Sequence, residues 1–368
     1  MTKGVFVLDL LAHSRLVMCW WLWAMLACLA LADQGLELPR LEAAAARLRQ
    51  LSCRPVPLVS LSREQIELEV SDWLAQKTAD QEEARWAHLL ELCGMLPAGR
   101  QPLEVRQQLL REQVRGFYDA RRGHFALVQD GSGAVLEETT AFHELIHALQ
   151  DQHFELLPLL RGFPGEFDRS LAAQCLVEGD ANSAMVDYML ESAGLPRVRD
   201  TNPPPFLHLQ SPAFFRHSLM VPYAFGQHWV DQLRARGGWE AVNRAYASPP
   251  LSSEQIFHPE KYPEEKPHSI ELKVAARPAE VSLGQDTGGE FTLRCWAQQR
   301  GASQEVAIGW GGDRFEVFQG SAGARVVWRT SWDTGQDARE FQHFLASIPE
   351  VQRMQRHGLR VDFELFRH

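Results

Sequence analysis

The segment His143-Glu144-Leu145-Ile146-His147 constrains the fold of this chain more than any other feature. Its flanks, from Ala141 to Leu149, are otherwise apolar, a pattern that predicts a buried α-helix. Residues four positions apart lie on one face of such a helix, so both imidazoles can reach a single metal ion. The motif therefore predicts a Zn²⁺ site with His143 and His147 as ligands. Glu144 is then the general base that acts on a zinc-bound water.

The composition is that of a globular protein large enough for two or three domains. The chain has 368 residues, of which 45% are hydrophobic, so it can bury a large core. Its formal net charge is -10 and no Lys/Arg-rich run occurs, which argues against a nucleic-acid partner. A peptide or protein substrate remains compatible with this charge, and the oligomeric state is open.

The amino terminus has the pattern of a signal peptide. Residues 16–32 form an apolar run that follows Lys3 and Arg15 and ends in Ala30-Leu31-Ala32, a small-residue cleavage pattern. We therefore interpret residues 1–32 as a signal peptide and expect an extracytoplasmic protein that is secreted, periplasmic or attached to the cell envelope. An uncleaved membrane anchor and lipid attachment at Cys28 stay open as alternatives.

Removal of this segment leaves an even number of cysteines in a compartment where disulfides persist. They are Cys53, Cys93, Cys175 and Cys295. One or two disulfides are possible among them, which the sequence alone cannot pair, with a free buried thiol as the alternative for Cys175. None of the four has the spacing of a cysteine-type zinc site.

Periodicity divides the rest of the chain into helical and strand-rich parts. Residues 33–110 show apolar spacing typical of helices. Short strands are expected at 116–119 and 124–128, with a turn at 130–133 and a third strand possible at 134–136. Further helices are expected at 170–190, 222–235 and 239–245, with Gly237-Gly238 as the break. Alternation predicts strands at 291–296, 315–318, 324–328 and 359–365, and a helix at 337–348.

A catalytic zinc site usually needs a third protein ligand, and two residues compete for that role. His153 lies six residues after His147, which is the metzincin spacing, but the turn glycine of that pattern is replaced by Gln150. Without the glycine the helix is expected to continue and to carry His153 away from His147. The other candidate is Glu178, a carboxylate on the next long helix.

The segment from His143 to Phe154, followed by Leu176-Val177-Glu178-Gly179-Asp180-Ala181, resembles a family of secreted bacterial zinc metallopeptidases of the gluzincin type that is largely uncharacterised. The resemblance extends over 222–226, 249–262 and 307–313, and thus covers about 97–344. It implies a thermolysin-like core in which His143, His147 and Glu178 bind zinc and Glu144 is the base.

The fold class expected from these observations is α+β. A mainly helical zincin-like metallopeptidase core at 111–270, with a small sheet before the motif helix, follows the N-terminal helical region at 33–110. A C-terminal α+β domain occupies 271–368. Within that domain, Gly309-Trp310-Gly311-Gly312-Asp313 predicts a turn that packs Trp310, with a metal or sugar role for Asp313 as the alternative.

One position departs from thermolysin-like enzymes, in which an acid four residues after the ligand glutamate orients a zinc-bound histidine. That position is Asn182, and Asp180 is an alternative partner for the imidazole. The group that stabilises the oxyanion is also unassigned. Tyr223 and His258 are candidates because both are expected in loop-like or helix-edge contexts downstream of Glu178.

The function expected from the sequence is that of a zinc-dependent peptidase, more specifically an endopeptidase, outside the cytoplasm. Its membrane contact is limited to a possible N-terminal anchor or lipid. The alternative is a non-catalytic binding protein that keeps a peptidase fold, with or without a structural metal. The presence of Glu144 favours the enzyme, because a degenerate site would be expected to lose its base or a ligand.

Overall fold

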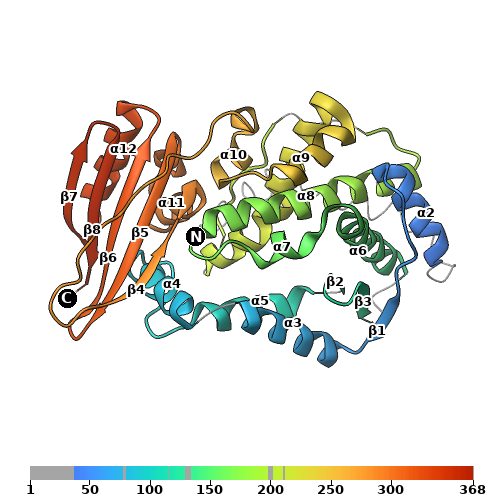
Figure 1. Ribbon diagram of the computed structural model, residues 1–368, viewed down its shortest axis with the longest axis horizontal. Coiled ribbons are helices and arrows are strands. Elements are labelled where there is room, and N and C mark those ends of the chain that lie inside the picture. The colour runs from blue at the N-terminus through green and yellow to red at the C-terminus, as the bar shows by residue number, and fades with distance from the viewer. Residues whose placement is uncertain are drawn as a thin grey trace, which may run out of the picture. The chain divides into compact units, whose positions relative to one another are not determined.

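A computed structural model describes residues 37–77, 80–114, 116–128, 134–197, 202–209 and 212–367. The expected signal peptide, Cys28 and the turn at 130–133 lie outside these residues. The fold is mixed α+β with a C-terminal sheet, as expected (Figure 1). Within the described part of the chain, no helix combines the length and apolar character needed to cross a membrane.

The chain folds into two compact units. The first comprises the described parts of Met1–Arg63, Arg115–His153 and Ala181–Asp200, and the second those of Glu64–Val114, Phe154–Asp180 and Thr201–His368. The helix α8 (Phe167–Ser192) is continuous through the boundary after Asp180.

The first unit contains a three-stranded sheet and the motif helix. Its strands β1 (Leu58–Leu61), β2 (Gly116–Asp119) and β3 (His124–Val128) are arranged in the order β1-β3-β2, with β2 antiparallel and β1 parallel to β3. The strands expected at 116–119 and 124–128 are therefore confirmed. The possible third strand at 134–136 is wrong, because those residues begin α6 (Ala134–Phe154). The third strand is instead β1, which lies inside the region expected to be helical.

Helices make up most of the first half of the chain. They are α2 (Leu38–Arg49), α3 (Arg63–Lys77), α4 (Asp80–Leu92) and α5 (Pro102–Gln113), and α7 (Leu156–Arg161) follows α6. Proline stands in the first turn of both α2 and α5, where its missing N–H costs no helical hydrogen bond. Cys53, Cys93, Cys175 and Cys295 are all free thiols, so none of the possible disulfides forms among them and Cys175 is the free buried thiol of the alternative.

The helix α9 (Ala213–Ala247) begins nine residues before the predicted start at 222. Pro222 lies inside it, and the chain departs from helical geometry at Gly237 and Gly238, where the break was expected. The short α10 (Ser253–Phe257) and the 3-10 helix η2 (Pro259–Lys261) follow. Ser252 caps α10, since its hydroxyl accepts a hydrogen bond from the backbone N–H of Gln255.

The C-terminal part forms a five-stranded antiparallel sheet in the order β4-β5-β6-β8-β7. Its strands are β4 (Val281–Asp286), β5 (Trp310–Gly320), β6 (Gly323–Trp332), β7 (Val351–His357) and β8 (Arg360–Phe366). The helix α12 (Gly335–Ala346) lies beside these strands (Figure 1), and the 3-10 helix η3 (Gln304–Ala307) precedes β5 in the chain. The strands expected at 315–318, 324–328 and 359–365 and the helix expected at 337–348 are confirmed within a few residues.

The strand expected at 291–296 is wrong, because these residues form the helix α11 (Gly289–Gln299). Its residues are buried on nearly every side, so the alternation of apolar residues does not mark one face. Trp296 of α11 stacks on Trp328 of β6 at 6.0 Å and meets Phe344 of α12 edge-on at 5.3 Å. Both helices therefore pack on one aromatic layer of the sheet.

Asp313 is a structural anchor of this sheet. Its carboxylate is buried and accepts hydrogen bonds from the backbone N–H groups of Gly288 and Gly289, at 2.8 Å each. The indole N–H groups of Trp310 and Trp328 also donate to it, at 3.2 and 2.7 Å. Trp310 is packed inside, as expected, but the predicted turn is wrong for 310–313, because these residues begin the strand β5 with a register shift between Trp310 and Gly312. The four donors satisfy the buried carboxylate.

Candidate metal centre

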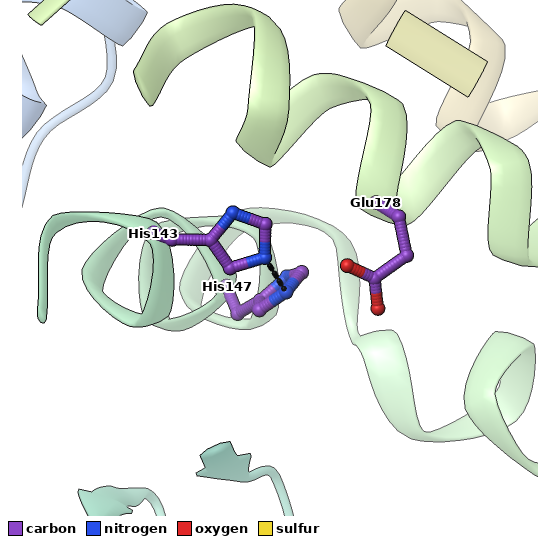
Figure 2. A group of neighbouring side chains, drawn as sticks. All are labelled: His143, His147 and Glu178. Carbon is purple, nitrogen blue, oxygen red and sulfur yellow. Dashed lines mark hydrogen bonds between the residues drawn. The ribbon is translucent and has the colours of Figure 1, made fainter. Parts of the chain in front are cut away.

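The two motif histidines meet at their Nε2 atoms on α6. These atoms are 3.0 Å apart, and the rings are nearly perpendicular with centroids 4.7 Å apart (Figure 2). The side chains are only 8% and 9% exposed, and Glu144 between them is 7% exposed. The apolar residues Phe142, Leu145, Ile146 and Leu149 are fully buried around them, so the helix is held on all sides. The i, i+4 spacing thus produces a rigid pair of imidazoles.

Glu178 joins this pair from α8. One ligand atom from each of His143, His147 and Glu178 lies within 4.8 Å of the other two, and Figure 2 shows the carboxylate directed toward the imidazoles. His143 and His147 are buried and Glu178 is partly buried. The structure therefore brings together the three residues that the sequence nominated as ligands.

The donor set fits zinc. Zinc binds imidazole nitrogens at about 2.0–2.1 Å in tetrahedral sites, which sets two such nitrogens about 3.3 Å apart. The 3.0 Å separation of the two Nε2 atoms is close to this value. Two imidazoles and one carboxylate also match the ligand types of catalytic zinc sites, in which a fourth position stays open.

His147 has a hydrogen-bond partner that sequence reasoning did not identify. Nδ1 of His147 lies 2.9 Å from Oε1 of Gln150, one turn further along α6. An amide oxygen only accepts hydrogen bonds, so this contact is a hydrogen bond in the tautomer that carries its proton on Nδ1 and presents its lone pair on Nε2. In that tautomer Nε2 of His147 can accept from a protonated Nε2 of His143 or bind a metal ion. The i, i+3 spacing of His147 and Gln150 is a signal that the sequence contained.

Asp180, considered as a partner of the imidazoles, is fully buried and accepts a hydrogen bond from the hydroxyl of Tyr246 at 2.8 Å. Tyr246, on α9, in turn stacks on Phe154 at 4.1 Å. Asp180 therefore takes part in fastening α8 to α9. Asn182 is also buried, at 3% exposure.

His153 does not belong to the metal-ligand group. The helix α6 continues through Phe154, as the absence of a glycine at position 150 predicts. The Nε2 atom of His153 lies 2.8 Å from the backbone oxygen of Ser52, to which it donates. The metzincin arrangement is therefore absent from this helix.

The start of α8 is anchored firmly, which positions Glu178. The backbone N–H of Phe167 donates to Asp286 at 2.8 Å, and Asp286 also binds the guanidinium of Arg85 at 2.9 Å. Asp168, in the first turn, accepts a hydrogen bond from the backbone N–H of Ser253 at 3.0 Å. Burial raises the pKa of Asp168 well above its ordinary value.

The two oxyanion candidates lie in different surroundings. Tyr223 is 44% exposed and lies within α9 rather than in a loop. His258 ends α10, and its Nε2 lies 3.1 Å from Oε1 of the buried Glu290. Burial lowers the pKa of His258, but the hydrogen bond and charge of Glu290 outweigh it and raise the pKa overall. The role of either residue at an oxyanion stays a prediction.

A second group of carboxylates, Glu254, Glu265 and Asp333, surrounds an amino group instead of a metal. Nζ of Lys261 lies 2.7 Å from Glu254, 2.6 Å from Glu265 and 2.5 Å from Asp333. Burial raises the pKa of Glu254 to about 8 against the opposing effect of Lys261. The lysine supplies the positive charge that these acids need.

Comparison with known proteins bears only on the C-terminal sheet. The model of a domain of unknown function (DUF8575) matches residues 277–362, which run from just before β4 into β8. Neither a curated protein nor a solved structure matches the chain. The matched segment is less than half of the chain and does not include His143, His147 or Glu178.

Proposed function

We propose that the protein is a zinc-dependent peptidase of the gluzincin type, with His143, His147 and Glu178 as zinc ligands. The observation that carries the proposal is the convergence of these three side chains, two of them buried, within 4.8 Å. Two imidazoles and one carboxylate are the ligand types of catalytic zinc sites, and a cation would be attracted to the carboxylate beside them. The helix order, with a small sheet before α6 and the ligand glutamate on α8, supports a zincin-like core.

Bound zinc would supply a Lewis acid and would lower the pKa of a water molecule from 15.7 to about 7. Glu144 follows the first ligand on α6 and is 7% exposed, so its carboxylate accepts a proton in surroundings that exclude most bulk water. Glu144 would take the proton of the water that attacks the peptide carbonyl and pass it to the leaving amine.

The three-stranded sheet provides the substrate-binding element in this proposal. In the order β1-β3-β2, the outer strands β1 and β2 each have one edge without a partner strand in the sheet. An extended peptide pairs with such an edge through backbone hydrogen bonds, which favours an endopeptidase acting on extended segments. Action outside the cytoplasm is part of the proposal and depends on the signal-peptide interpretation of residues 1–32.

Elemental analysis of the purified protein tests the metal assignment. We expect about one zinc per chain. Glu178→Ala should lower zinc occupancy, whereas Glu191→Gln, an exposed position near the end of the same helix, should not. A protein that stays zinc-free after incubation with the metal would refute the proposal.

Cleavage of a mixed peptide library tests the catalytic assignment. Glu144→Gln should retain zinc and lose hydrolysis, while Glu155→Gln, at an exposed position after α6, should keep both. A chelator should abolish the wild-type activity. Zinc binding without cleavage of any peptide would instead favour the non-catalytic binding protein, and full activity of Glu144→Gln would exclude Glu144 as the base.

A further inference from the structure

Gln150 is fully buried and directs its amide oxygen at the imidazole of His147. Its Oε1 atom lies 2.9 Å from Nδ1 of His147, and its side chain has 0% exposure. Both residues lie on α6 three positions apart, so the contact depends only on helix geometry and on the two rotamers. This contact is not part of the motif that nominated the zinc ligands.

We propose that Gln150 is the positioning residue for His147, a role that rests on the zinc site proposed above. By accepting the Nδ1 proton, Gln150 holds the neutral imidazole in the tautomer whose Nε2 lone pair faces Glu178 and His143. It also fixes the rotation of the ring, because moving Nε2 would break the 2.9 Å hydrogen bond. The orienting partner thus comes from the motif helix itself.

The chemistry of the amide suits this role. A neutral amide at Gln150 adds no charge next to two imidazoles and a carboxylate. A carboxylate there would make the imidazole a more basic ligand.

Competition with a zinc chelator measures the contribution of Gln150 to metal affinity. Gln150→Met keeps the size of the side chain and removes the acceptor, so its zinc affinity should fall by roughly 10–100-fold. Gln150→Glu restores an acceptor and should bind zinc at least as tightly as the wild type. The matched control is Gln152→Met. Gln152 lies on the same helix and makes its hydrogen bonds to the backbone of Arg54, at 2.8 and 3.0 Å, so this change should leave zinc affinity within about threefold.

The tautomer of His147 gives a second readout that needs no zinc. Long-range ¹H–¹⁵N spectra of the metal-free protein, recorded where the imidazoles are neutral, should show the proton of His147 on Nδ1. The signal is assigned by its loss in His147→Asn. In Gln150→Met the proton should redistribute toward Nε2, and in Gln152→Met it should stay on Nδ1.

The outcomes separate this inference from the proposed function. Equal zinc affinity in Gln150→Met and the wild type would overturn the positioning role while leaving the zinc site intact. If the wild type binds no zinc, the proposed function fails. The tautomer measurement does not depend on zinc, so an Nδ1 proton that stays in place in Gln150→Met would overturn the inference in either case. If Gln150→Met fails to fold, weak zinc binding by a folded Gln150→Glu would likewise overturn it.

Discussion

Replacement of Gly226 by alanine should separate the two helices that hold Glu178 in place. Gly226 of α9 lies against α8, where a Cβ atom added to it would come 2.3 Å from the carbonyl oxygen of Cys175. The contact is reciprocal, since a Cβ on Gly179 would come 2.2 Å from the carbonyl carbon and oxygen of Gly226. Both neighbours are backbone atoms, so no side chain can rotate away to make room.

The geometry sets the size of the effect. Real Cβ atoms essentially never approach heavy atoms closer than 3.0 Å, so the helices must separate by at least 0.7 Å at Gly226. Such overpacking costs about 1–3 kcal/mol. The gain in helix propensity from glycine to alanine returns about 1 kcal/mol. Because the clash involves backbone on both sides, we take the upper end of the cost and expect a net destabilisation of about 2 kcal/mol.

The displacement also reaches the proposed metal site, because Glu178 precedes Gly179 in the chain. Ligand distances in metal sites are held within about 0.2 Å, several times less than the expected shift. Denaturant unfolding of the zinc-free protein and chelator competition therefore measure two consequences of one change. Ala224→Ser, at an exposed position on the same helix, should change stability by no more than about 0.5 kcal/mol and leave zinc affinity unchanged. A Gly226→Ala protein that is more stable than the wild type and binds zinc normally would refute the reasoning.

Three further predictions follow from other contacts. His153→Ala removes a hydrogen bond to Ser52 and should cost about 1 kcal/mol of stability with no change in zinc affinity; a tenfold loss of affinity would restore His153 as a ligand. The hydrogen bonds from the Arg325 guanidinium lower the pKa of Glu280 from 4.5 to about 2, so this pair stabilises the fold above pH 4.5 and the contribution is lost as the pH falls through about 2. Glu280→Gln should therefore flatten the fall in the denaturation midpoint across that acid window, and parallel curves for the two proteins would contradict the assignment. Asp313→Asn exchanges one carboxylate oxygen for an NH₂ group that cannot accept from the donors facing it, and should destabilise the fold by about 3–5 kcal/mol in denaturant unfolding; a loss below about 1 kcal/mol would show that the anchor is dispensable.

Local pattern predicted the motif helix well because its decisive features lie within one or two turns. The spacing of His143 and His147 places both imidazoles on one face, and Gln150 in place of glycine predicts that the helix continues past the motif. The His147–Gln150 contact could have been predicted in the same way, because residues three positions apart on a helix are neighbours. The metzincin pattern draws attention only to the missing glycine at position 150.

Hydrophobic periodicity predicted the wrong secondary structure where an element is buried on more than one face. In α11, residues 291–297 are buried with the exception of Arg294, so their alternation carried no information about strand or helix. In β1, four residues are too few for a period to be recognised. The strand exists because β3, more than sixty residues later in the chain, offers a parallel partner.

The sequence by itself determined the paired imidazoles, the glutamate between them and the helical break at Gly237-Gly238, because each depends on residues that are neighbours along one segment. Only the tertiary structure decided that Glu178, and not His153, completes the cluster. Its position depends on the anchoring of α8 at Asp286 and on the glycine contact with α9. These are packing relations between segments far apart in the chain, and no local period encodes them.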